Sequence, residues 1–311
     1  MPLSPEQLKP RLEGVLGFPI TPFHPDGSLN VGALRRHVGW MAGTGVNAIF
    51  VCAGTGEYAA LALEEYREAV GAAVKEVAGR VPVLAGVGYS TAIACQFARE
   101  AERAGVDGLL ALPPYLVVPE QEGLYRHYRQ IAESAGIGVI LYHRDNALFT
   151  PDTVARLAEL PTLVGFKDGC GNLEQFIRTR LTLGDRLAWI NGMPTAEMTF
   201  PAFHACGARA FTSATSNFIP HVTRRFYRAV VEGDRETADA ILNTVIEPLC
   251  RIRDRRKGYA ISYVKAAVTL MGRLAPDGAG TVRPPSVELS PPEIQELRGL
   301  LDSIRERWPE A

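Results

Sequence analysis

The stretch GVILY at residues 138–142 is followed, about 20 residues later, by LVGFK at residues 163–167. Both runs are short and almost continuously apolar, without the polar alternation of a strand that faces water on one side. Such runs are typical of parallel strands that are buried on both faces of a sheet. The interval between them is long enough for one helix, so the pair predicts a strand–helix–strand unit.

Six further runs extend this pattern in both directions along the chain. Their starts lie between about 20 and 35 residues apart, which is the length of one strand–helix unit. The eight candidate strands are Val15–Ile20, Asn47–Val51, Val81–Gly86, Gly108–Leu112, Gly138–Tyr142, Leu163–Lys167, Leu187–Ile190 and Arg209–Thr212. Eight such units predict an α/β protein with a closed (β/α)8 barrel, the TIM barrel fold; a doubly wound open sheet is the alternative.

A helix is predicted between the second and third strands. Over Glu64–Ala78 the apolar residues recur at intervals of three and four, which places them along one face of a helix. These residues are Tyr66, Ala69, Val70, Ala73, Val74 and Val77. The opposite face is charged, as expected of a helix that covers the outside of a barrel.

The strand pattern stops near residue 232. Beyond it, helical patterns cover Thr237–Ile252, Ala260–Met271 and Pro292–Trp308, with a Gly/Pro-rich loop at Leu274–Pro285. We therefore expect a barrel with the active site over residues 1–232 and a C-terminal helical region over residues 233–311. The basic run Arg251–Lys257 is interrupted by Asp254, and we expect it to face solvent or a neighbouring subunit.

The charge balance of the chain bears on the kind of molecule that it binds. The 311 residues include 33 Lys+Arg and 34 Asp+Glu, a formal net charge of -1. Such a balance gives no field that would hold nucleic acid or an acidic membrane, so a small-molecule enzyme is the default expectation. Five cysteines without a CxxC motif predict reduced thiols and a cytoplasmic location, and the polar N-terminus does not resemble a signal peptide.

Metal and cofactor motifs are not found. The six histidines lack HExxH or HxxxH spacing, and no Asp/Glu cluster indicates a metal site. Gly169 and Gly171 form neither a P-loop nor a GxGxxG turn, so a nucleotide cofactor is not expected. We predict an enzyme that works without a metal or a cofactor.

The residues directly after each strand should carry the chemistry, because they converge at the carboxyl-terminal mouth of a barrel. Lys167 ends the sixth run. Burial of an ammonium is costly, so desolvation lowers the pKa of such a lysine toward the free amine that attacks a carbonyl and forms a Schiff base. The alternative is a lysine at the barrel rim that pairs with Asp168.

Two further residues at the same mouth are candidates. Tyr142 ends the fifth strand, so its phenol can move protons beside Lys167; the alternative is a core tyrosine bonded to backbone. Thr55 lies between Gly54 and Gly56, where a hydroxyl and N–H groups can hold a carboxylate; the alternative is simply a tight strand–helix turn.

Five motifs together resemble the dihydrodipicolinate synthase/N-acetylneuraminate lyase superfamily of Schiff-base barrels. They are GFPITPF (17–23), AGTGEYAAL (53–61), PPY…QEGLYRHY (113–128), LYHRDN (141–146) and GFKDG (165–169). The resemblance implies that Lys167 forms the imine, Tyr142 relays protons and Thr55 helps to bind the carboxylate of a 2-oxo acid. It also implies a homo-oligomer, either a tetramer or a dimer.

Three departures separate the chain from the synthase branch of this superfamily. Gly54 stands in place of a second threonine, Ala147 in place of an arginine and Leu116 in place of a second tyrosine. Other motifs are similar to 5-dehydro-4-deoxyglucarate dehydratases: INGMPTAE (190–197), FTSATSNFIP (211–220), RKGYAISYVKA (256–266) and AGTVRPP (279–285). The chain is therefore expected to belong with these dehydratases.

This resemblance implies a class I lyase that dehydrates and decarboxylates 5-dehydro-4-deoxy-D-glucarate to 2,5-dioxopentanoate, water and CO2. The expected substrate-binding residues are Gly54, Thr55, Arg144, Asn191, Gly192, Ser213 and Asn217. The same imine can instead drive aldol cleavage of a 2-oxo-3-deoxy sugar acid or an N-acetylneuraminate-type substrate. A sugar-acid-binding regulatory barrel without turnover is a further alternative.

Overall fold

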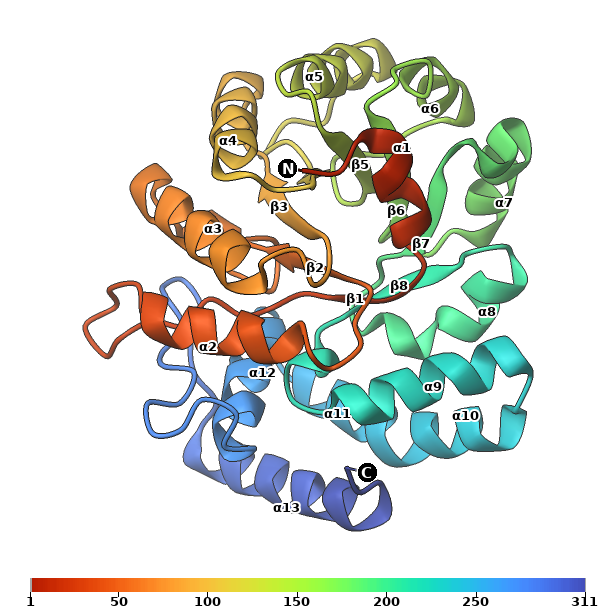
Figure 1. Ribbon diagram of the computed structural model, residues 1–311. Helices are drawn as coiled ribbons and strands as arrows, with labels where there is room; N and C mark the ends of the chain where they lie inside the picture. Colours follow the sequence, from red (N-terminus) through yellow and green to blue (C-terminus); the bar gives the residue numbers. More distant parts are fainter. Residues whose placement is uncertain (1, 311) are drawn as a thin grey trace.

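The computed structural model describes residues 2–310, and its centre is a closed barrel of eight parallel strands (Figure 1). Each strand pairs with its neighbours in sequence, and β8 closes the barrel against β1. The strands are β1 (Gly14–Gly17), β2 (Ala48–Val51), β3 (Val83–Val87), β4 (Gly108–Ala111), β5 (Gly138–His143), β6 (Leu163–Asp168), β7 (Ala188–Asn191) and β8 (Ala210–Ser213). The predicted (β/α)8 barrel is confirmed, and the open sheet is excluded.

The first strand is shorter than predicted. It ends at Gly17 rather than Ile20. Pro19 follows almost at once, and a proline has no N–H to donate to the ladder of a neighbouring strand. The other boundaries differ from the prediction by no more than two residues.

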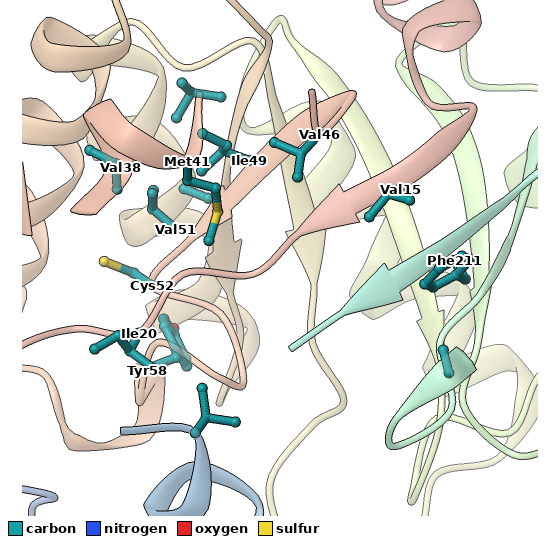
Figure 2. Packing of buried hydrophobic residues seen from close by; sticks show 14 of the residues in the cluster. Val15, Ile20, Val38, Met41, Val46, Ile49, Val51, Cys52, Tyr58 and Phe211 are labelled. Atoms are coloured by element: carbon teal, nitrogen blue, oxygen red, sulfur yellow. The ribbon is translucent and has the colours of Figure 1, made fainter. Parts of the chain in front are cut away.

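Helices cover the outside of the barrel (Figure 1). They are α2 (Val31–Met41), α3 (Leu63–Val77), α4 (Thr91–Ala104), α5 (Gln121–Glu133), α6 (Pro151–Leu157), α7 (Leu173–Leu183), α8 (Phe200–Ala205) and α9 (Pro220–Glu232). Figure 2 shows how the layers meet: Val38 and Met41 of α2 lie against Ile49 and Val51 of β2. Of the predicted stripe on α3, only Val74 is less than fully buried.

The amino-terminal end of the barrel is closed by the short helix α1 (Pro5–Leu8). Leu8 is fully buried and belongs to the cluster that fills the barrel interior. Gly108 and Gly138 allow this close approach, because a Cβ atom at either position would lie within 3 Å of the Leu8 side chain. Only the carboxyl-terminal end of the barrel is therefore left for a cavity.

The C-terminal region consists of α10 (Arg235–Ile241), α11 (Glu247–Arg253), α12 (Tyr259–Leu270) and α13 (Pro291–Arg307). The predicted helix 237–252 is continuous, but it contains a π-helical turn over Leu242–Ile246. Pro248 follows this turn, and its ring cannot fit against the carbonyl of Thr244 in a regular α-helix. Widening of the preceding turn accommodates the proline without ending the helix.

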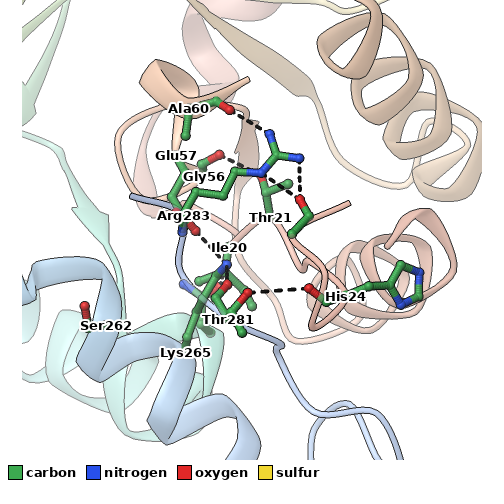
Figure 3. A network of polar contacts seen from close by, with 12 residues as sticks. Ile20, Thr21, His24, Gly56, Glu57, Ala60, Ser262, Lys265, Thr281 and Arg283 are labelled. Carbon is green, nitrogen blue, oxygen red and sulfur yellow. Dashed lines mark hydrogen bonds and ion pairs between the residues drawn. The ribbon is translucent and has the colours of Figure 1, made fainter. Parts of the chain in front are cut away.

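A buried ion pair joins α12 to the turn after β2 (Figure 3). Lys265 Nζ lies 2.6 Å from Glu57 Oε1, and both side chains are only 3% exposed. The amine also donates to the carbonyl of Thr281 at 2.6 Å, and the N–H of Arg283 donates to Glu57 Oε2 at 3.0 Å. Both charges are thus paired and hydrogen-bonded, as a stable buried pair requires.

Two further contacts hold the same turn. The guanidinium of Arg283 pairs with Glu65 at the start of α3 and donates to the carbonyl of Gly27. From the other side, Thr21 Oγ1 donates to the carbonyl of Gly56 at 2.7 Å. The turn over residues 54–57 is therefore held between the end of β1 and the C-terminal region.

We expect Lys265→Met to lower the free energy of unfolding by about 3–5 kcal/mol, because it leaves the Glu57 carboxylate buried without a cation. Adding Glu57→Gln should recover most of this loss, since the glutamine still accepts the N–H of Arg283 without a charge. Denaturant unfolding of the two variants measures both effects. If Lys265→Met alone were as stable as the parent, this ion pair would not stabilise the protein.

Candidate active site

A cavity of about 750 Å³ opens at the carboxyl-terminal end of the barrel. The loops after several strands and the residues around α12 form its walls. Six of the nine predicted site residues line it: Gly54, Thr55, Tyr142, Arg144, Lys167 and Gly192. The structure therefore brings together the residues that sequence reasoning placed at the ends of four different strands.

Lys167 is a buried amine without a counter-ion. It is 3% exposed, and its Nζ donates to the carbonyl of Gly192 at 3.2 Å. Within residues 2–310 no carboxylate oxygen lies within 4.0 Å of this nitrogen. Burial lowers the pKa of Lys167 well below its usual range and the nearby Arg144 lowers it further, whereas Asp168 opposes the shift. The lysine is thereby held toward the neutral, nucleophilic amine.

The alternative, a pair between Lys167 and Asp168, is not formed. The Asp168 carboxylate instead accepts the backbone N–H groups of Cys170 and Gly171, both at 2.9 Å. These bonds hold the carboxylate in the loop that follows β6. Asp168 thus shapes this loop rather than neutralising the amine.

Tyr142 stands next to Lys167 because the two residues are direct partners in the register of β5 and β6. Its hydroxyl donates to the carbonyl of Gly192 at 3.1 Å, the same oxygen that accepts from Lys167 Nζ. Arg144 Nη1 donates to the phenolic oxygen at 3.0 Å. Burial raises the pKa of Tyr142 while Arg144 opposes this, so the phenol is a resting acid whose phenolate has a cation beside it.

Gly192 allows the two reactive groups to share one acceptor. A Cβ atom at this position would lie 2.4 Å from Lys167 Cγ and 2.7 Å from its Nζ. Any side chain here would displace the amine. The glycine that was predicted to bind substrate therefore lines the cavity with its backbone, close to the lysine.

The turn over Gly54, Thr55 and Gly56 contributes Gly54 and Thr55 to another wall of the cavity. It is bracketed by Cys52 and Glu57, both in the left-handed region with φ of 47° and 54°. Within residues 2–310, neither the N–H of Thr55 nor that of Gly56 donates to a protein acceptor. Thr55 lines the cavity, so its free N–H and its hydroxyl form a suitable site for a carboxylate, with the free N–H of Gly56 next to them in the chain.

Three predicted substrate-binding residues do not reach the cavity, because their side chains are fully buried in hydrogen bonds to the protein. The amide of Asn191 donates to Ala196 and Thr199, and the hydroxyl of Ser213 donates to Glu197. The amide of Asn217 donates to the carbonyls of Phe18 and Ala214. These side chains shape the loops beneath the cavity.

Sequence reasoning missed a contribution from the C-terminal region. Arg253, at the end of α11, lines the cavity with its side chain only 16% exposed. The expectation that the whole run Arg251–Lys257 faces solvent or a subunit is therefore wrong for Arg253. A signal was available: Arg253 follows Leu249 by four residues and Cys250 by three, so the three share one helix face, and both of those residues are buried.

The described residues contain neither a metal site nor a membrane span. Over residues 2–310, no group of three or more His, Cys, Asp or Glu side chains is placed to hold a metal ion. No helix in the same range is long and apolar enough to cross a membrane.

A closed barrel with an unpaired lysine beside a tyrosine at its mouth defines a Schiff-base lyase. The model of the dihydrodipicolinate synthetase family matches residues 11–304. The chain belongs to this family.

Similar proteins give a narrower comparison. The chain is 45% identical over 305 residues to a probable 5-dehydro-4-deoxyglucarate dehydratase of Rhizobium meliloti (strain 1021), covering 97% of this chain and 100% of the relative. A protein of Bacillus subtilis (strain 168) with the same name is 42% identical, with 95% of each chain covered. Among solved structures, dihydrodipicolinate synthase from Oceanobacillus iheyensis superposes with a TM-score of 0.90 at 28% identity, covering 97% of this chain and 100% of that one.

We expect Lys167→Met to be more stable than the parent at pH 7, because the folded parent must hold an amine that water would protonate in the unfolded chain. This advantage should shrink as the pH rises toward about 10.4, the usual lysine pKa, by about 1.4 kcal/mol per pH unit while only the unfolded amine is charged. Denaturant unfolding at several pH values measures the difference.

The same substitution at Lys75, an exposed residue of α3, is the matched control. The side chain of Lys75 is exposed to water. The difference in free energy of unfolding between Lys75→Met and the parent should therefore not change with pH in this way. If the difference in free energy of unfolding between Lys167→Met and the parent did not change with pH, Lys167 would be charged in the folded protein.

Proposed function

We propose that this enzyme is a decarboxylating 5-dehydro-4-deoxyglucarate dehydratase that forms 2,5-dioxopentanoate, water and CO2. The observation that supports it most directly is the buried, unpaired amine of Lys167, which shares an acceptor with the phenol of Tyr142. The name of the relatives supplies the substrate. It is a six-carbon diacid with a 2-oxo acid at one end, a methylene beside it, two hydroxylated carbons and a distal carboxylate.

The first stage of the proposed mechanism is formation of the imine. Lys167 Nζ attacks the ketone, and loss of water from the carbinolamine leaves a protonated imine. Tyr142 donates the proton that the departing hydroxyl needs, because burial keeps its phenol protonated at rest. Arg144 stabilises the phenolate that results, through its existing bond to the phenolic oxygen.

The second stage is elimination and decarboxylation. The protonated imine acidifies the adjacent methylene, and the phenolate of Tyr142 removes that proton to give an enamine. Tyr142 then returns the proton to the β-hydroxyl, which leaves as water. The resulting conjugated iminium accepts the electron pair of the bond to the distal carboxylate, which leaves as CO2. Protonation, tautomerisation of the enol to the aldehyde and hydrolysis of the imine then release 2,5-dioxopentanoate and the free amine.

The proximal carboxylate is assigned to the turn of Gly54, Thr55 and Gly56. Gly54 and Thr55 line the cavity, and within residues 2–310 the N–H groups of Thr55 and Gly56 have no protein acceptor. Backbone N–H groups that need no reorganisation bind an anion well. We also assign the chemical steps to the barrel, residues 1–232, and part of substrate recognition to the C-terminal region, residues 233–311.

A homo-oligomer is the proposed assembly, a dimer or a tetramer. The loop after β4 exposes four consecutive large apolar side chains, Tyr115 to Val118, each between 61% and 83% exposed. A continuous apolar patch of this kind is typical of a surface that contacts a protein partner. The five cysteines are all free, which supports a reducing compartment such as the cytoplasm.

Covalent trapping combined with a turnover panel tests the proposed function. Borohydride added with pyruvate should leave a mass adduct on the peptide that contains Lys167, and turnover of the diacid should release CO2 and 2,5-dioxopentanoate. The panel also includes the 2-oxo-3-deoxy aldonate analogue, and pyruvate with an aldehyde. Lys167→Met is the control and should neither trap nor turn over.

Each contrary result has a distinct meaning. An adduct on Lys265, the other buried lysine, would contradict the assignment of the imine, since that amine is already paired with Glu57. Cleavage of the aldonate to pyruvate without release of CO2 from the diacid would favour an aldolase. Binding without turnover of any compound would indicate a regulatory protein.

We expect Tyr142→Phe to lower the turnover rate by about 10²–10⁴-fold, because it removes the acid while the ring still packs against Lys167. The free energy of unfolding should change little in comparison. Steady-state kinetics and denaturant unfolding measure the two effects. Turnover within a few-fold of the parent would assign the proton transfer to another group.

A further inference from the structure

Three cationic side chains line the cavity within the described residues: Lys167, Arg144 and Arg253. The first reacts with the ketone. The second donates to the phenolic oxygen of Tyr142, next to the reacting lysine, so its charge already serves the proton-transfer centre. Arg253 is the remaining cation, and it comes from α11, outside the barrel repeat.

The guanidinium of Arg253 is fixed in place rather than free to turn. Its Nη1 donates to Thr195 Oγ1 at 2.6 Å, and its Nε and Nη2 donate to the two carboxylate oxygens of Asp254 at 2.7 and 2.9 Å. Thr195 itself lies in the left-handed region with φ of 48°, in the loop after β7. Two separate segments of the chain therefore hold the cation at the cavity wall.

Hydrogen-bonding capacity remains on this group. A guanidinium carries five N–H donors, and the bonds to Thr195 and Asp254 use three of them. One N–H on Nη1 and one on Nη2 are left. These two nitrogens can donate to both oxygens of one carboxylate, which is the geometry in which arginine binds a carboxylate most strongly.

The acidic neighbours do not cancel the charge at the cavity. Asp254 is 62% exposed, so water screens its carboxylate, whereas the Arg253 side chain is only 16% exposed. Glu197 is fully buried nearby, but its Oε1 accepts from the hydroxyls of Ser213 and Thr215, and within residues 2–310 it forms no ion pair with Arg253. The cation thus keeps part of its attraction for an anion in the cavity.

We propose that Arg253, held by Thr195, binds the distal carboxylate of the substrate and makes the enzyme select a diacid over a monoacid. This inference rests on the proposed function, because it assigns the far end of that substrate. The turn at Thr55 and the guanidinium of Arg253 then bind the two carboxylates from different walls of one cavity, with Lys167 also facing it.

A comparison of two substrates tests this assignment. The first is 5-dehydro-4-deoxyglucarate, and the second is the 2-oxo-3-deoxy aldonate, which has a hydroxymethyl group in place of the distal carboxylate. Arg253→Gln should lower kcat/KM for the diacid by about 10- to 100-fold, the loss expected for a hydrogen-bonded charge pair. Borohydride trapping of pyruvate on Lys167 should stay within about two-fold of the parent, because pyruvate has no distal end.

Matched variants separate this role from a structural one. Arg251→Gln removes the same charge from the same helix, but Arg251 is 75% exposed and pairs with Glu247, so its kcat/KM values should equal those of the parent. Thr195→Val should lower kcat/KM for the diacid only. The loss should be smaller than in Arg253→Gln, because Thr195→Val loosens the guanidinium without removing it. If the parent turns over the aldonate, its kcat/KM for that substrate should be unchanged in these variants.

The outcomes distinguish the inference from the proposed function. If the parent turned over the diacid and Arg253→Gln matched it, only the role of Arg253 would be overturned. Loss of pyruvate trapping in Arg253→Gln would also overturn it, because the residue would then act at the lysine end. If the parent used the aldonate and not the diacid, the proposed function would fail and the inference with it.

Discussion

The proposed reaction depends on one amine that the fold removes from water without a carboxylate beside it. A closed barrel with a sealed amino-terminal end provides the apolar surroundings for this, because β6 delivers Lys167 to the inside just below the cavity. The carbonyl of Gly192 gives the nitrogen a hydrogen-bond partner that does not require a positive charge. Neutrality at this position is costly to the fold and is the condition for nucleophilic attack.

A second buried lysine, Lys265, has the carboxylate partner that Lys167 lacks. Lys265 is as buried as Lys167, but Glu57 lies 2.6 Å from its nitrogen and favours the charged form. The paired amine of Lys265 is therefore a structural cation, and the unpaired amine of Lys167 is the one that we assign as the nucleophile. Burial alone does not distinguish these roles; the neighbouring carboxylate does.

The sequence predicts the barrel, and the place of Lys167 and Tyr142 in it, for a physical reason. Parallel strands are recognisable as apolar runs, and each run ends at the mouth, so the placement of Lys167 and Tyr142 at the mouth follows from strand order. Strand order does not predict the direction of a side chain or its hydrogen-bond partners. Asn191 and Ser213 also end strands, yet their side chains are satisfied in the loops beneath the cavity.

Arg253 was missed because helices outside the repeat have no fixed relation to the barrel mouth. Only the folded chain shows that α11 ends at the cavity and that α12 reaches the turn beside Thr55. This placement separates two tasks. The barrel strands hold the lysine and tyrosine that any 2-oxo acid would meet, while the C-terminal region contacts both walls that we assign to the carboxylates. On this assignment, discrimination between distal ends lies with Arg253 of the C-terminal region and with Thr195 of the loop after β7, because the groups assigned to the imine do not contact the distal end.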